Sequence, residues 1–260
     1  MHHSGRGKSS TFATFALSLA LLAACRPAPE RQDTNQAAPP PAAKPAAIPV
    51  PQRALDREAL LVAAMRAASA AATGIDDRGL QDELRGRRFE FRWRFACDDN
   101  VLGGSMRADL GKDEETLRVT VEPTLAADSP LVAPWLEQGF EAASGFIVDQ
   151  PWLLTPACAA PAAGEGTLAI AELFTAEGSR ASRPPQKFEI TRKIDGGALP
   201  EGGFDFVLSG RMEPLPDGKV IHCLAADPGT RPQCLISVKV DRAAVENPAD
   251  GQVLGDWGGR

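Results

Sequence analysis

The chain has 260 residues and a formal charge of −6 at pH 7, because 34 acidic residues outnumber 28 basic ones. An acidic chain of this kind is a poor ligand for nucleic acid or for an anionic lipid surface, since both attract a positive face. Apolar residues make up 43% of the sequence, which is enough to build a core, whereas tyrosine is absent and aromatic residues are few. The length fits one large domain or two small ones.

The N-terminus has the pattern of an export signal. Arg6 and Lys8 stand before an apolar or small run from Phe12 to Ala24, and no acidic residue occurs among them. This run is shorter than the roughly 20 residues that span a bilayer. A positive start, a short apolar stretch and small residues before a break are typical of a secretory signal peptide. An ordinary buried helix is the alternative, but the proline-rich sequence that follows offers it nothing to pack on.

A cysteine ends this signal. The sequence Leu22-Ala23-Ala24-Cys25 resembles the lipobox of bacterial lipoproteins. The resemblance implies that residues 1–24 are removed as a signal peptide and that Cys25 carries diacylglycerol and an acylated amino group. Two or more acyl chains give stable membrane attachment. Arg26, in place of the aspartate that commonly retains such proteins in the inner membrane, favours the outer membrane facing the periplasm.

Residues 25–54 are predicted to be a lipidated cysteine followed by a disordered tether. Residues 26–54 hold eight prolines and eight alanines and no aromatic residue. Such a segment cannot bury enough apolar surface to offset its chain entropy. We therefore expect one globular domain over residues 55–260.

The domain is predicted to open with helices and to continue as strands. Leu61, Met65, Ala68 and Ala72 fall at helical spacing between residues 55 and 73, and Gly74 suits a helix end. A shorter helix is expected over 77–85, with Leu80 and Leu84 on one face.

From residue 88 to 97 the apolar period changes to two, which predicts a half-buried strand. Further strands are expected around 105–110, 116–122, 167–174 and 187–194. A short helix is expected from Pro134, with Leu136, Phe140 and Ala143 at helical spacing, and residues 145–158 fit neither period. Turn residues divide the last third into an antiparallel meander. The fold class is therefore α+β to mainly β, with an antiparallel sheet or sandwich and an N-terminal helical segment.

Four cysteines remain after Cys25, and an even number in an exported protein favours disulfides. Folding residues 221–236 as a hairpin about Pro228-Gly229 places Cys223 opposite Cys234 and puts the apolar residues on one face. This register predicts a Cys223–Cys234 disulfide and leaves Cys97 and Cys158 for the second. A redox-active pair is disfavoured because nothing nearby stabilises a thiolate. A metal site is disfavoured because C-x-x-C is absent and a single histidine follows the signal.

That histidine, His222, is placed by the same register on the opposite face, which we expect to meet solvent. Its companions on this face are Leu235, Ser237, Lys239 and Asp241. No G-x-S-x-G nucleophile elbow occurs, so a histidine-based hydrolase is disfavoured. Two converging carboxylates would suffice for glycoside cleavage, but the sequence does not show which acids meet.

Two other polar groups have an ordinary structural interpretation. Asp98-Asp99-Asn100 lacks the wider pattern of a calcium loop and is interpreted as an ordinary loop. One cluster of basic residues is typical of a solvated strand face, although it leaves room for an acidic partner. It comprises Arg85, Arg87, Arg88, Arg92 and Arg94. No catalytic, cofactor-binding or metal-binding residue is predicted.

The leading hypothesis is a non-enzymatic module of the cell envelope that binds an envelope protein or a cell-wall component from its lipid anchor. The alternatives are a carboxylate-dependent hydrolase and a carrier of an apolar ligand. Converging acids with raised pKa values in a deep cleft would favour the hydrolase. A large apolar cavity would favour the carrier.

Overall fold

The computed structural model describes residues 52–97, 105–113, 115–158, 167–181, 185–194, 199–225, 227 and 229–258. The predicted signal peptide, Cys25, most of the predicted tether and Asp98-Asp99-Asn100 lie outside these ranges. The chain divides into two units, residues 1–49 and 50–260, and the description below concerns the second.

Four helices occur in the described ranges, and the first two are the predicted N-terminal pair. The helices are α1 (Arg57–Thr73), α2 (Arg78–Leu84), α3 (Ala133–Leu136) and α4 (Ala176–Ala181). Helix α1 begins where the Asp56 carboxylate accepts a hydrogen bond from Ala59 N, and it ends at Gly74, whose φ of 68° is left-handed. No helix in these ranges has the length and hydropathy needed to cross a membrane.

The strands form two sheets. They are β1 (Arg88–Phe95), β2 (Met106–Leu110), β3 (Thr116–Val121), β4 (Phe140–Ile147), β5 (Leu168–Thr175), β6 (Phe188–Lys193), β7 (Phe204–Met212), β8 (Ile221–Leu224), β9 (Gln233–Glu246) and β10 (Val253–Gly258). The larger sheet has the order β1-β7-β9-β5-β4, with β8 and β10 also paired to β9, and the smaller has the order β2-β3-β6. Pairing is antiparallel except between β5 and β9, which run parallel.

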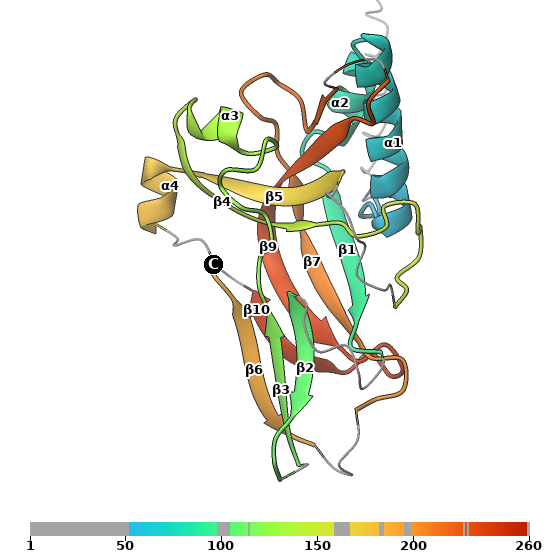
Figure 1. The fold of residues 1–260 in the computed structure, drawn as a ribbon, viewed down its shortest axis with the longest axis vertical. Coiled ribbons are helices and arrows are strands. Elements are labelled where there is room, and N and C mark those ends of the chain that lie inside the picture. Colours follow the sequence, from blue (N-terminus) through green and yellow to red (C-terminus); the bar gives the residue numbers. More distant parts are fainter. Residues whose placement is uncertain are drawn as a thin grey trace, which may run out of the picture. The chain divides into compact units, whose positions relative to one another are not determined.

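The two sheets and α1 enclose one apolar core, as the mainly β fold class predicts. In Figure 1 the smaller sheet lies over the lower part of the larger one, and α1 and α2 stand at its upper edge. Aromatic residues from both sheets meet in this core: the Phe188 and Phe206 ring centroids lie 5.5 Å apart. The alternation predicted for β1 is present, since Phe89, Phe91, Trp93 and Phe95 are all buried.

Three details of the sequence prediction are wrong. The last third is not a meander, because β7 and β8 both pair with β9 and not with each other. Phe140 and Ala143 belong to β4 and not to the short helix, because α3 stops at Leu136 and Gly139 turns the chain with a φ of 101°. Met65 is half exposed, because α1 buries the stripe formed by Leu60, Leu61, Ala63, Ala64 and Ala67. Residues 145–158, which fit neither period, are mostly irregular, but residues 145–147 form the end of β4.

Candidate binding site

A small apolar pocket lies where four segments distant in the sequence meet. These are α1, the loop after β4 and the beginnings of β5 and β9, which lie close together in Figure 1. The pocket has a volume of about 90 Å³ and is called the α1 pocket below. Its lining residues are Leu61, Ala64, Met65, Ala68, Pro151, Trp152, Thr167, Leu168, Arg231, Pro232 and Cys234.

The floor of the α1 pocket is held by the β8–β9 hairpin. Cys223 pairs with Cys234 in the predicted register, and a disulfide joins them with their Cα atoms 4.0 Å apart. The outer edge of β8 is tied to α2 by a single side chain: Gln81 Oε1 accepts hydrogen bonds from Val220 N at 2.7 Å and Ile221 N at 3.0 Å, and Gln81 Nε2 donates to Ile221 O. The floor is therefore cross-linked on both sides.

One wall of the pocket is positioned by a buried arginine. Arg57 Nε donates to Leu153 O at 2.9 Å and Arg57 Nη1 donates to Arg92 O at 3.0 Å, so the side chain joins the Trp152 loop to β1. Its guanidinium also lies over the Phe91 ring, 4.7 Å from the centroid. Burial lowers the pKa of Arg57 to about 10. The arginine remains charged at neutral pH and fixes the loop that carries Trp152.

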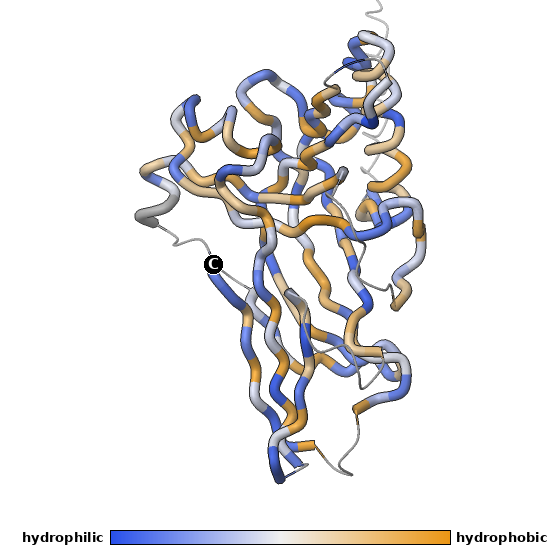
Figure 2. Tube along the Cα trace, in the orientation of Figure 1, coloured by the Kyte–Doolittle hydropathy of each residue, from blue (hydrophilic) through white to orange (hydrophobic). Residues whose placement is uncertain are grey.

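The rim of the pocket exposes large apolar side chains. Met65 is 51% exposed and Trp152 is 56% exposed. In Figure 2 apolar residues are visible on α1 and on the neighbouring segments. Arg231 adds a charge at this rim, and no ion pair joins it to a carboxylate of the described chain. The pocket thus combines an apolar lining with one cation available to a ligand.

A second region carries many charges and is called the ionic face. It lies on the outer side of β1, β7, β9 and β10. Arg92 pairs with Glu90 and Glu246 at 2.8 Å each, and Arg94 Nε donates to Asp205 at 2.5 Å. Burial acts to lower the pKa of Arg92, but the hydrogen bonds to Glu246 and Glu90 outweigh it and raise that pKa. The members of the ionic face are Glu90, Arg92, Arg94, Asp205, Arg242, Glu246 and Asp256.

The ionic face bears on two sequence hypotheses. The sequence left room for an acidic partner of the basic cluster. For Arg92 and Arg94 this partner is the chain itself, because Glu246 pairs with Arg92 and Asp205 with Arg94. The acids that do converge, Asp205 and Glu246, are opposite each other on β7 and β9 and share Arg92 between them. They belong to an ion-pair network in which four acids meet three arginines.

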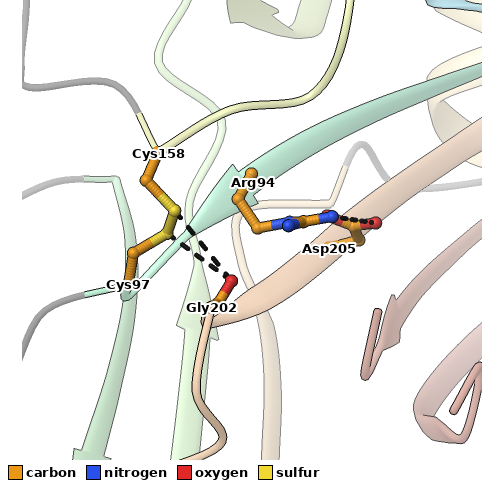
Figure 3. Close-up of a disulfide and its surroundings, with 5 residues drawn as sticks. All are labelled: Arg94, Cys97, Cys158, Gly202 and Asp205. Carbon is orange, nitrogen blue, oxygen red and sulfur yellow. Dashed lines mark hydrogen bonds and ion pairs between the residues drawn. A yellow bond between two sulfur atoms is a disulfide. The ribbon is translucent and has the colours of Figure 1, made fainter. Parts of the chain in front are cut away.

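The second disulfide closes one corner of the sandwich beside the ionic face. Cys97 and Cys158 are bonded with their Cα atoms 5.9 Å apart, and both sulfur atoms lie near Gly202 O, as Figure 3 shows with Arg94 and Asp205 alongside. The backbone of this corner leaves no room at Gly203, where an added Cβ would stand 2.1 Å from Phe95 O. Both disulfides join the cysteines that the sequence pairs.

The expectation that the His222 face meets solvent is wrong for Leu235 and Ser237, although Lys239 on the same face is exposed as expected. Both residues are buried, and Leu235 belongs to a second apolar cluster. His222 Nδ1 lies 2.7 Å from Asp217 Oδ2, and its ring meets Trp135 edge-on at 4.8 Å. This half-buried pair has the geometry of an oriented imidazole, but no hydrogen bond among the described residues joins it to a serine or cysteine. The cluster comprises Leu125, Leu131, Val132, Trp135, Ala169, Ala171, Leu215 and Leu235.

Of the residues that line the α1 pocket, the sequence singles out Cys234 for its disulfide, but not Trp152 or Arg231. Trp152 lies in the stretch with no period, and helical spacing predicts Met65 on the apolar side of its helix. A lone tryptophan between prolines in an irregular segment was the one available signal. No family model, curated protein or solved structure matches the chain.

Proposed function

We propose that the protein is a lipid-anchored module of the bacterial cell envelope that binds a protein or cell-wall partner through the α1 pocket. The observation that carries this proposal is the exposure of Met65 and Trp152 around a small pocket with a cross-linked floor. Interface anchors are enriched in tryptophan, methionine and arginine. The function requires no cofactor.

The volume of the α1 pocket favours a binding module over a carrier. Sites for small molecules and cofactors enclose about 300–1,000 Å³. The α1 pocket, at about 90 Å³, is several-fold smaller and open to the surface. It suits one protruding group of a larger partner better than a whole ligand enclosed for transport.

The anchor in this proposal is Cys25. Acylation there would hold the domain on a tether of residues 26–54, whose flexible form would span about 30 Å root-mean-square. Removing residues 1–24 removes Arg6 and Lys8 but no acid, so the formal charge would move from −6 to −8. The tether, and not surface charge, would then keep the domain near the membrane.

Crosslinking in the native envelope tests the binding function. A photoreactive amino acid placed at Met65 should trap a specific partner, and the same amino acid at Val253, an exposed apolar position on β10, is the matched control. Trapping from both positions alike, or from neither, would contradict the proposal.

Metabolic labelling with a fatty-acid analogue tests the anchor. We expect label on the mature protein, and expect Cys25→Ala to leave an uncleaved or mislocalised precursor. A mature protein that carries no label and begins at another residue would refute this half of the proposal.

A further inference from the structure

The chemistry of the α1 pocket narrows the partner further, and this step rests on the proposed function. We infer that the partner is a polypeptide that inserts one apolar side chain into the pocket and pairs an adjacent acidic residue with Arg231. Three observations carry the inference: the size of the pocket, the composition of its rim and the arginine at its mouth, which no carboxylate of the described residues engages.

Size and rim point to a side chain. The walls are formed by short apolar groups such as Leu61, Ala64 and Leu168, which leave a space of about 90 Å³. Protein interfaces concentrate their energy in a few side chains that fill pockets of this kind, surrounded by groups that exclude water. Met65 and Trp152, both about half exposed, are placed to close over an inserted side chain and lose contact with water.

The charge at the mouth selects an acidic neighbour. Arg92, Arg94 and Arg242 are all engaged by carboxylates on the ionic face, whereas Arg231 has no such partner among the described residues. Its guanidinium can take a carboxylate through two parallel hydrogen bonds.

The acid nearest Arg231 in the sequence is already committed. Asp227 accepts hydrogen bonds from Gly229 N at 2.8 Å and Thr230 Oγ1 at 2.6 Å, which fix the turn. The turn therefore presents Arg231 without neutralising it. A carboxylate supplied by the partner would complete this pair.

Peptide selection tests the inference. A displayed library of short random peptides is panned on the mature chain carrying Cys25→Ser, on the same chain with Arg231→Glu and on the same chain with Trp152→Ser. We expect the parent to enrich an apolar residue next to Asp or Glu. Arg231→Glu should keep the apolar preference but replace the acid by Lys or Arg. A synthetic peptide from the parent selection should bind Arg231→Glu about tenfold more weakly.

The possible failures are distinguishable. Enriched peptides without a preference for an acid would overturn this inference and leave the binding function standing. Equal enrichment on the parent and on Trp152→Ser would contradict the proposed function itself. Displacement of the selected peptide by decanoate, or by a synthetic peptide of residues 37–51, would assign the pocket to an acyl chain or to the protein's own tether and would overturn the inference. Thermal melts of the two variants, both altered at exposed side chains, verify that they fold.

Discussion

The ionic face and the α1 pocket lie on the surface of the same domain but differ in how far their side chains are paired within the chain. On the ionic face each of the four acids is paired with an arginine, and Arg92 alone contacts three of them. At the α1 pocket Trp152 and Met65 face water, and Arg231 has no carboxylate within the described chain. A surface whose interactions close on themselves stabilises the fold, whereas one that leaves apolar area and charge open is suited to a partner. Substitutions in the two regions should therefore separate stability from binding.

Of the two regions, the ionic face is expected to show the larger loss of stability. Asp205 is 4% exposed and holds Arg94 and part of Arg92, so Asp205→Ala leaves partly buried cations without their counter-charge. Removing one partner of a buried pair costs several kcal/mol, and the partial exposure of the arginines places the expected loss at about 3 kcal/mol. Urea unfolding measures this loss in the free energy of unfolding. The control is Asp241→Ala, because Asp241 forms an exposed ion pair with Arg211. Losses of equal size in both variants would show that burial of the network is unimportant.

A smaller loss is expected on the pocket side. Arg57→Met keeps the apolar stem of the side chain but leaves Leu153 O and Arg92 O without their donor. Two partly buried acceptors left unpaired should lower the free energy of unfolding by about 2 kcal/mol and loosen the Trp152 loop. The control is Arg53→Met, at an exposed arginine, which should change the free energy of unfolding by less than about 0.5 kcal/mol. Amide hydrogen exchange in residues 150–154 reports the mobility of the loop, and unchanged exchange there in Arg57→Met would contradict the positioning role.

A pH-dependent effect is expected where α1 meets α2. The hydrogen bond from Arg66, followed by that from Leu80 N, lowers the pKa of Asp77. A lowered carboxyl pKa contributes stability above the unfolded-state pKa, and this contribution disappears as the pH falls through the folded-state value. Asp77→Asn should therefore be less stable than the parent near neutrality, and the difference should vanish in acid. Denaturation midpoints measured from pH 7 down to strong acid test this. Because the pair is exposed, molar salt should shrink the difference, and a gap independent of pH and salt would contradict it.

Sequence reasoning succeeded where the signal is local. The alternation in β1 and the register of the β8–β9 hairpin follow from a period of two and from turn residues within a few positions of each other. It failed where burial is decided by distant segments. Helix α1 is rich in alanine on every side, so its sequence gives little indication that Met65 faces out. The covering of the His222 face depends on residues 125–135, about 90 positions away in the chain. The parallel pairing of β5 with β9, which builds the floor of the pocket, is equally nonlocal.

A small effect on stability, and the sharpest separation of the two regions, is expected from Trp152→Ser. More than half of this side chain is exposed, so its loss should change the free energy of unfolding by only about 1 kcal/mol. The matched control is Trp135→Ser. That tryptophan is 3% exposed and packs on His222, so its removal should cost about 3–5 kcal/mol. The crosslinking experiment uses a protein concentration and a temperature at which the parent and Trp152→Ser are both fully folded. Under these conditions we expect Trp152→Ser to abolish crosslinking from Met65. Undiminished crosslinking in Trp152→Ser would show that its exposed indole has no part in recognition.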